Sequence, residues 1–350
     1  MSHANEQTPT TFENPLGLKG IAFLEFTGPD SAHFDAVFKD LGCSKTDRHT
    51  QKAIDHYCQQ DIHFLVNREE AGFAYQFAQA HGQSACAMGL AFEDANSAFE
   101  QAVIRGAKPA INKDHDLPAI MGVGDSLIYF VDSATNYFKT AFQPLENPEI
   151  VPENGFIRID HLTNNVFKGT MAQWVAFYKN IFGFSEVRYF DIKGEKTGLT
   201  SFALRAPVTD PYFAIPINEG NEDKSQIEEY LREYKGAGIQ HIALMTENLL
   251  DTLDRMVGSN IATLDIDPSY YEEAFQRVPQ VTEDRDHIQR HEVLIDGDPE
   301  GYLLQIFTQN QFGPIFFEFI QRKNHLSFGE GNFGALFRSI ERDQERRGVL

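Results

Sequence analysis

The sequence predicts an α+β protein of two domains, assembled from four copies of one strand–helix–strands unit. The first observation is a repeat: four times, a short apolar strand is followed by a polar turn and an amphipathic stretch. The second is its spacing, because the equivalent positions Phe23, Met88, His161 and His241 lie 65, 73 and 80 residues apart. The third is residues 144–155, rich in Pro, Asn and Glu, which predict a linker between two pairs of units.

Each unit is expected to begin with an apolar strand and to continue as a helix. The four strands are GIAFLEF (20–26), CAMGLAF (86–92), IDHLT (159–163) and GIQHIAL (238–244). The stretches after them space apolar residues as on one helix face, as at Trp174, Phe177 and Ile181. Further strands are predicted at SLIYFVD, SFALRA, YFAIPI and YLLQIFT. GVGD (122–125) lacks the Lys-Ser/Thr of a phosphate loop and predicts a turn.

These units divide the chain into a flexible N-terminus (1–14), an N-terminal domain (15–145) and a C-terminal domain (155–350). The 350 residues are 42% hydrophobic, which excludes wholesale disorder, and include 30 Phe. Phe23, Phe26 and Phe92 are expected in the core.

Charge and composition exclude several classes of partner. The net charge of −21 repels phosphate backbones and anionic lipids, so we expect neither a nucleic acid nor a membrane partner. No run of about 18 apolar residues occurs, and the polar start MSHANEQTPTTFENPLG predicts no signal peptide. Cys43, Cys58 and Cys86 lack CxxC spacing, so we expect small buried side chains in a reducing cytoplasm.

The repeat brings three candidate metal ligands to attention. The equivalent positions hold Phe23 and Met88 in the first two units but His161 and His241 in the last two. The fourth unit ends in PIFFEFI, where Glu318 is surrounded by apolar residues and would be costly to bury unpaired. Two neutral imidazoles and a carboxylate leave open positions on a metal, which suits non-haem Fe(II) dioxygen chemistry.

Each of these residues has an ordinary structural interpretation when taken alone. A histidine in a strand is more often a hydrogen-bonded core residue, and Glu318 could pair with Arg322 or Lys323. A second histidine pair, His287 and His291, would share one helix face. Because its surroundings are densely charged and no HExxH pattern occurs, we expect a solvated helix face there.

The chain resembles the 4-hydroxyphenylpyruvate dioxygenase family of the vicinal-oxygen-chelate superfamily from about residue 15 to the C-terminus, most strongly after residue 155. The motifs that carry this resemblance are IDHLTNNV, PINEG…KSQIEEYL, GAGIQHIAL, GYLLQIFT, IFFEFIQR and FGEGNFGALFRSIE. It implies four βαβββ modules paired into two open-barrel domains. It also implies iron only in the C-terminal domain, and a C-terminal helix that closes the site.

The resemblance also assigns roles to residues of this chain. His161, His241 and Glu318 would hold one Fe(II) per subunit. The polar residues of the catalytic pocket would be Ser201, Asn218, Gln240 and Gln305. The remaining substrate-binding positions would be Pro216, Gln226, Phe307, Phe328, Asn332 and Phe333, with Phe307 and Phe333 on either side of an aromatic ring. For Asn332, a simple cap of the last helix is the structural alternative.

The implied reaction converts 4-hydroxyphenylpyruvate, an aromatic 2-oxo acid, and O₂ to homogentisate and CO₂ in tyrosine and phenylalanine catabolism. O₂ would be the co-substrate, without 2-oxoglutarate, haem or nicotinamide, in a homodimer or homotetramer. A 4-hydroxymandelate synthase is the nearest alternative, and Pro216, Asn218 and Phe333 favour ring hydroxylation instead. A non-catalytic binding protein would be expected to lack a ligand, and an extradiol catechol dioxygenase would need a further acid–base histidine.

Overall fold

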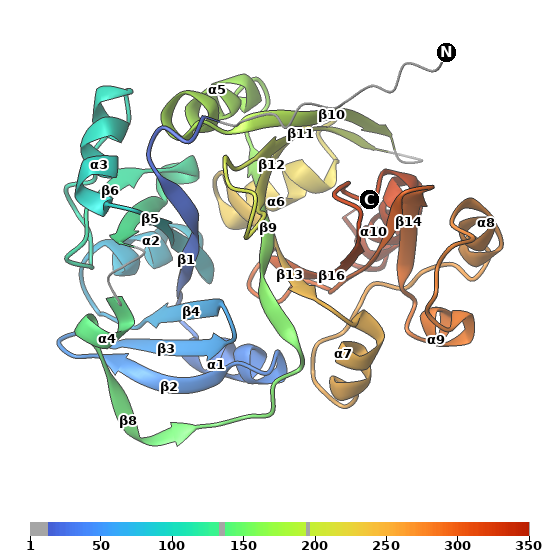
Figure 1. The fold of residues 1–350 in the computed structure, drawn as a ribbon, viewed down its shortest axis with the longest axis horizontal. Helices are drawn as coiled ribbons and strands as arrows, with labels where there is room; N and C mark the ends of the chain where they lie inside the picture. The colour runs from blue at the N-terminus through green and yellow to red at the C-terminus, as the bar shows by residue number, and fades with distance from the viewer. Residues whose placement is uncertain (1–12, 133–136, 194–196, 350) are drawn as a thin grey trace, which may run out of the picture.

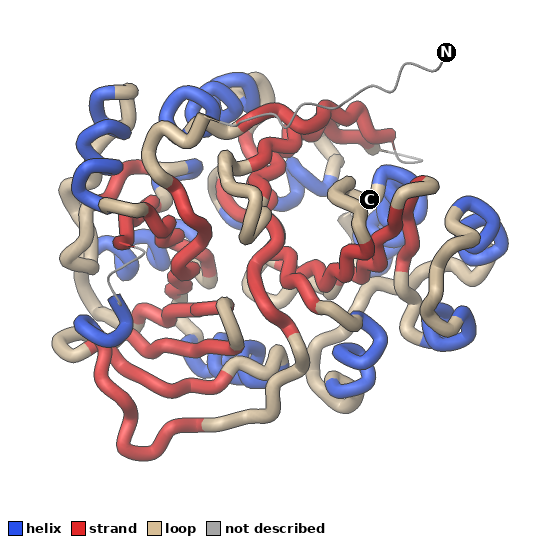
Figure 2. Tube along the Cα trace, viewed as in Figure 1, coloured by secondary structure: helices blue, strands red, loops and turns tan. Residues whose placement is uncertain are grey.

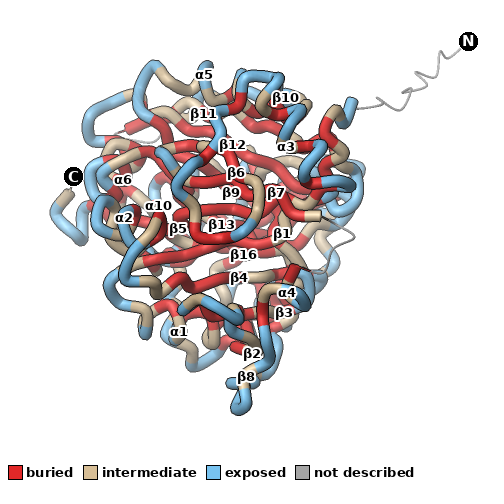
Figure 3. The backbone as a smooth tube through the Cα atoms, turned by 90° about the vertical axis from the view of Figure 1, so that its left-hand side faces the viewer, coloured by how far each residue is buried: buried red, intermediate tan, exposed pale blue. Residues whose placement is uncertain are grey.

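Two curled eight-stranded sheets lie side by side in the protein, one in each half of the chain (Figure 1). The structure is a computed structural model that describes residues 13–132, 137–193 and 197–349. Of the N-terminus predicted to be flexible, residues 1–12 lie outside the described residues. The helices cover the outer faces of the sheets, and the strands form the buried interior (Figures 2 and 3).

The N-terminal half has the strand order β6-β7-β5-β1-β4-β3-β2-β8. Its elements are β1 (Leu18–Thr27), α1 (Ser31–Asp40), β2 (Ser44–His49), β3 (Ile54–Gln59), β4 (Ile62–Asn67), α2 (Phe73–His81), β5 (Ser84–Phe92), α3 (Ala95–Ile104), β6 (Ala119–Met121), η1 (Val123–Asp125), β7 (Leu127–Asp132), α4 (Tyr137–Ala141) and β8 (Phe142–Glu149).

The C-terminal half has the order β10-β11-β12-β9-β13-β16-β15-β14. Its elements are β9 (Phe156–Val166), α5 (Met171–Phe177), η2 (Tyr178–Phe182), β10 (Ser185–Lys193), β11 (Gly198–Arg205), β12 (Ala214–Gly220), α6 (Gln226–Tyr234), β13 (Gly238–Thr246), α7 (Leu249–Arg255), α8 (Tyr270–Arg277), α9 (Arg285–Arg290), β14 (Leu294–Asp298), β15 (Gly301–Phe307), β16 (Phe316–Lys323), η3 (Glu330–Asn332) and α10 (Phe333–Arg346).

The strand pairing confirms the fourfold repeat. In each unit the first strand runs parallel to the last, as in β1–β4, β5–β7, β9–β12 and β13–β16. The first strands of two consecutive units pair antiparallel, which joins the units into one sheet in each half. The fold is therefore α+β with two paired-unit domains, as the sequence predicts.

The second unit departs from the repeat because two described strands, β6 and β7, follow its helix α3, whereas three strands follow the helix in each of the other units. β8 does not join β7 but pairs antiparallel with β2 at the far edge of the sheet. Residues 144–149, predicted as part of the linker, are therefore a strand, and only residues 150–155 connect the two halves. Pairing with β8 covers the backbone groups of β2 that would otherwise form an open sheet edge.

The alignment of Met88 with His241 is wrong by one residue. His241 pairs with Thr163, two residues after His161, whereas the residue that pairs two positions after Phe23 is Ala87. Since successive side chains of a strand point to opposite faces, this offset places Met88 on the other face of the sheet. Sequence similarity could not reveal this offset, because Ala87 and Met88 are neighbours in the same apolar strand.

Aromatic side chains fill the interior of the N-terminal half. Phe23 is fully buried, and its ring lies 5.8–6.4 Å from the rings of His115, Tyr129, Tyr137 and Phe138. Gly89 pairs with Phe23, and a Cβ at Gly89 would lie 2.4 Å from that ring. These contacts occupy the positions that correspond to the ligand row of the C-terminal half.

The two halves contact each other through aromatic and backbone groups. Phe312 of the C-terminal half lies 4.5–5.6 Å from the rings of Phe26, Phe34 and Phe38 of the N-terminal half. Gly124, which the sequence places in a turn, approaches the backbone of Ala237 so closely that a Cβ would lie 1.9 Å from its carbonyl oxygen. Many of the phenylalanines thus serve core and interface packing.

Cys43 and Cys86 are buried, Cys58 is half-buried, and none of the three forms a disulfide. Every helix in the described ranges is too short or too polar to span a bilayer.

Candidate metal centre and pocket

The three candidate ligands lie on one face of the three adjacent strands β9, β13 and β16. Ala243 of β13 pairs with His161 of β9 on one side and with Glu318 of β16 on the other. Residues paired across strands point to the same face, and so does His241, two residues before Ala243. The small Ala243 side chain leaves room for the ligands to converge above it.

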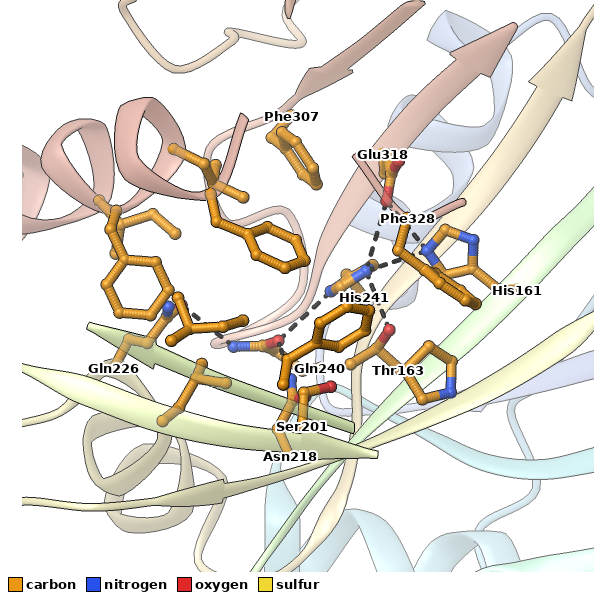
Figure 4. A pocket seen from close by; sticks show the side chains of 18 of the residues that line it. His161, Thr163, Ser201, Asn218, Gln226, Gln240, His241, Phe307, Glu318 and Phe328 are labelled. Carbon is orange, nitrogen blue, oxygen red and sulfur yellow. Dashed lines mark hydrogen bonds and ion pairs between the residues drawn. The ribbon is translucent and has the colours of Figure 1, made fainter. Parts of the chain in front are cut away.

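Their donor atoms form a compact triangle (Figure 4). His161 Nε2 lies 3.0 Å from Glu318 Oε2 and 3.3 Å from His241 Nε2, and His241 Nε2 lies 3.5 Å from the same carboxylate oxygen. Donors about 2.1 Å from a first-row metal and at right angles would be about 3 Å apart. The donor set and its spacing therefore fit a divalent first-row metal.

Hydrogen bonds to the other ring nitrogens orient both histidines for metal binding. His161 Nδ1 donates to Asp160 Oδ2 at 2.8 Å, and His241 Nδ1 donates to Gln240 Oε1 at 3.3 Å. Both bonds point the Nε2 atoms toward each other and toward Glu318.

A buried ion pair supports the first histidine. Arg322 donates from Nε and Nη2 to the two carboxylate oxygens of Asp160, each at 2.8 Å. Its third nitrogen donates to the carbonyl oxygens of His325 and Ser327, in the loop that leads to the last helix. From the sequence, Arg322 was an alternative partner for Glu318, which lies four residues earlier. The pairing with Asp160 could not be predicted, because Asp160 lies on a different strand.

The pKa values of the triad reflect its compactness. Burial alone would lower the pKa of His161, but the charge of Glu318 and hydrogen bonds from Asp160 and Glu318 outweigh it and raise this pKa to about 9. Burial would raise the pKa of Glu318, but both histidines lower it to about 2. Burial lowers the pKa of His241. Near neutral pH, in the absence of metal, His161 is therefore protonated on Nε2 and faces the ionised Glu318 carboxylate.

Metal uptake should therefore release one proton from His161. Because this proton competes with the metal below pH 9, we expect the apparent affinity for Fe(II) or Co(II) to rise roughly tenfold per pH unit between pH 6 and 8. Anaerobic titrations at several pH values measure the slope. Affinity that does not change over this range would contradict a proton held by His161.

A pocket lies above the triad, and all the predicted site residues except Asn332 line it. Its walls come from β10, β11, β12, β15 and α10 as well as the ligand strands. The predicted residues that line it are His161, Ser201, Pro216, Asn218, Gln226, Gln240, His241, Gln305, Phe307, Glu318, Phe328 and Phe333. Glu318 and the two histidines are the only titratable groups among the described lining residues, and none is Lys or Arg.

The polar groups of the pocket form a short chain of amides. Asn218 Nδ2 lies 3.5 Å from Gln240 Oε1, and Gln240 Nε2 lies 3.4 Å from Gln226 Oε1. Gln305 is 1% exposed, and neither of its amide atoms has a hydrogen-bond partner among the described residues. A buried amide without a partner is costly, so Gln305 is available to a polar ligand.

The last helix covers the pocket with one apolar face. Phe333, Leu336, Phe337 and Ile340 of α10 all line the cavity and are spaced i, i+3, i+4, i+7. Of these four residues only Phe333 was predicted from the sequence, although the helical spacing also indicates the other three. Two further residues near the site were not predicted: Thr163, whose hydroxyl lies 3.0 Å from His241 Nε2, and Phe190, whose ring lies 5.2 Å from that of Phe333.

Asn332 points away from the pocket. It is fully buried, and its Oδ1 accepts hydrogen bonds from the Tyr270 hydroxyl at 2.6 Å and from Arg277 Nη2 at 3.2 Å. Its side chain forms no capping bond to α10 either. The residue holds η3 against α8, so its predicted contact with substrate does not agree with its position.

The size of Ala243 is expected to decide whether the triad can assemble. Ala243→Leu would insert a branched side chain between His161 and Glu318, and overpacking of this kind costs about 1–3 kcal/mol. We expect at least a tenfold loss of metal affinity, measured by Co(II) titration. Ala243→Ser is the matched control and should bind metal nearly as well as the parent chain. Equal affinity in the Leu variant would contradict the role assigned to this position.

Comparisons with known proteins agree with this fold. Residues 12–141 match the family described as hydroxyphenylpyruvate dioxygenase, HPPD, N-terminal, and residues 158–306 match the glyoxalase/bleomycin resistance protein/dioxygenase superfamily. Protein MelA of Shewanella colwelliana is 59% identical over 97% of this chain and 99% of its own length. The 4-hydroxyphenylpyruvate dioxygenase of Legionella pneumophila subsp. pneumophila (strain Philadelphia 1) is 46% identical over 96% of this chain and 98% of its own.

A solved structure is similar over most of the chain. The xylose isomerase-like TIM barrel/4-hydroxyphenylpyruvate dioxygenase fusion protein superposes with a TM-score of 0.77 at 26% identity, over 94% of this chain. This chain spans about half of that fusion protein, 52% of its length. Because the Legionella relative is 46% identical and aligns over nearly the full length of both proteins, the chain belongs to the 4-hydroxyphenylpyruvate dioxygenase family.

Proposed function

We propose that this protein is an Fe(II)-dependent dioxygenase that converts 4-hydroxyphenylpyruvate and O₂ to homogentisate and CO₂. The observation that carries the proposal is the facing arrangement of His161, His241 and Glu318 at one wall of an aromatic-lined pocket. Family relatives named 4-hydroxyphenylpyruvate dioxygenase support the same reaction.

The triad would hold Fe(II) through three donors and leave its other positions to ligands. When bound, Fe(II) supplies a chelation site for a 2-oxo acid and the one-electron chemistry that O₂ requires. Because the described pocket residues include no Lys or Arg, a substrate carboxylate can find its positive charge only at the metal. The 2-oxo acid end of the substrate would therefore face the triad.

The aromatic ring of the substrate would then extend away from the metal between apolar side chains. Phe307 and Phe333 come from opposite elements, β15 and α10, and can bind a planar ring through their faces or edges. Gln240, Asn218 and Gln305 offer uncharged donors and acceptors that can hold a phenol without competing for the metal. We assign these residues to orientation of the substrate.

Exclusion of water is the task of α10. Its apolar face of Phe333, Leu336, Phe337 and Ile340 lies over the pocket, so a bound substrate would be shielded from solvent during a reaction that passes through reactive oxidants. Phe328, whose ring lies 5.6 Å from that of His161, shields the ligand side in the same way.

Oxygen uptake and product identification test this function. The Fe(II)-loaded protein with 4-hydroxyphenylpyruvate should consume one O₂ and release one CO₂ for each homogentisate formed, as measured with an oxygen electrode and by chromatography. Hydroxymandelate as the product would instead identify a 4-hydroxymandelate synthase, in which the benzylic carbon is oxidised. Tight substrate binding without O₂ uptake would indicate the binding-protein alternative.

We also propose a place and an assembly for this activity. Free cysteines, two of them buried, suit a reducing cytoplasm, where the enzyme would act in tyrosine and phenylalanine catabolism. The chain is proposed to work as a homodimer or homotetramer, with the N-terminal half, whose interior is filled by aromatic side chains, available for subunit contacts. Light scattering of the purified protein measures the assembly.

A further inference from the structure

We propose that Asp254, His287 and His291 form a second metal site, for a divalent ion of the zinc class, at the outer edge of the C-terminal half. His287 lies in α9 and His291 follows that helix as its C-cap, while Asp254 lies in the last turn of α7. One ligand atom from each of the three residues lies within 4.8 Å of the other two. None of the three lines the pocket above the first triad.

The contacts bring both imidazoles to one carboxylate oxygen. His291 Nε2 lies 2.8 Å and His287 Nε2 lies 3.1 Å from Asp254 Oδ1, and the two rings are 5.1 Å apart at their centroids. The densely charged sequence around His287 and His291, without an HExxH pattern, predicted a solvated helix face. The side chains are in fact only 19% and 16% exposed, and they face another helix.

The backbone holds these residues in a fixed arrangement. Asp284 caps α9 by accepting the backbone N–H of His287 at 2.8 Å, and Ile288 anchors the helix in the core. On α7, Leu250 and Leu253 are buried on the side that packs against the protein. Both histidines therefore remain on the face of α9 that meets Asp254.

The chemistry of the donor set selects the metal class. Two imidazole nitrogens and one carboxylate oxygen suit Zn²⁺, Ni²⁺ or Cu²⁺, whereas Mg²⁺ and Ca²⁺ prefer oxygen ligands alone. The Asp254 side chain is half exposed, so an ion can enter from solvent and keep water as a further ligand.

The position suggests what the ion would do. Residues 256–293 separate α7 from β14 in the fourth unit, whereas only residues 41–43 separate α1 from β2 in the first. Figure 1 shows this insertion, with α8 and α9, at the edge of the C-terminal half. An ion shared by Asp254 and the two histidines would fasten the insertion to α7.

Zinc titration of the metal-free, full-length chain tests the site. We expect two Zn²⁺ per chain by calorimetry, one at each triad, and only one after the double substitution His287→Ala with His291→Ala. His241→Ala should remove the other, and the remaining site should then slow amide exchange of residues 285–291 when Zn²⁺ is added. His325→Ala is the matched control, because His325 is a similarly buried histidine that belongs to neither triad and lies 3.6 Å from Asp298.

Several outcomes would overturn the proposal. These are zinc binding by the parent protein that the double substitution does not reduce, or unchanged amide exchange at residues 285–291 when Zn²⁺ is added. A dissociation constant in the millimolar range, unaffected by Asp254→Asn, would also do so. We expect Asp254→Asn to weaken this binding about 10–100-fold while the far-ultraviolet circular dichroism spectrum stays unchanged. The test does not depend on the dioxygenase reaction, so either proposal can fail without the other.

Discussion

The His241→Ala variant is expected to lose Fe(II) binding and substrate-dependent O₂ uptake by more than about 100-fold, since even the loss of a group that only orients a ligand costs 10–100-fold. Two donors would remain, with Glu318 still 3.0 Å from His161. Anaerobic metal titration and oxygen electrode traces measure the two losses separately.

The fold should survive this change because the imidazole contributes little to core packing. His241 is only partly buried, whereas its neighbour Ile242 is fully buried on the other face of β13. The His325→Ala variant serves as control and should retain both metal binding and uptake. An Ala variant that turns over at the parent rate would mean that His241 is not a ligand.

The Arg322→Met variant is expected to lower the free energy of unfolding by about 3–5 kcal/mol, because it leaves the buried Asp160 carboxylate without its charged partner. Chemical denaturation measures this loss. Substituting Asp160→Asn as well should recover part of it, since the remaining amide carries no charge.

The pH dependence of this deficit has a definite sign. In the parent chain the Arg322 charge outweighs burial and holds the pKa of Asp160 well below its usual range. Without Arg322, burial raises the pKa of Asp160. The buried carboxyl group is then neutral at low pH, and as the pH rises the folded variant loses stability relative to the unfolded chain, in which this group ionises freely. The deficit relative to the parent should therefore be larger at pH 7 than at pH 4. A loss below 1 kcal/mol at pH 7 would contradict the importance of the pair.

The fold could be predicted from the sequence because hydrophobic periodicity repeats in each unit. The strands that contain Phe23, His161 and His241 were located correctly, and so was the class of the fold. The position of β8 could not be predicted, since whether a terminal strand joins its own unit or the far edge of the sheet depends on tertiary pairing. The one-residue offset at Met88 could not be predicted either, because neighbouring residues of a uniformly apolar strand differ only in the face to which they point.

Part of the candidate site could also be predicted from the sequence. His161, His241 and Glu318 stand out because a charged or polar side chain in an apolar strand requires a partner. Arg322 and Thr163 were missed because their contacts cross strands. The resemblance to the family assigned Asn332 to the substrate-binding residues, but its side chain accepts a hydrogen bond from the Tyr270 hydroxyl instead.

The last helix, α10, is attached to the protein differently from the strands that carry the metal ligands. The ligands lie on β9, β13 and β16, whose backbone bonds are internal to the sheet, so their amide hydrogens should exchange only when the C-terminal half unfolds. α10 is held from outside by side chains, with Glu341 accepting from Thr197 and Gln344 donating to Glu229. We therefore expect α10 to open more often than the sheet that carries the metal ligands, so that substrate exchange and metal loss occur on different timescales.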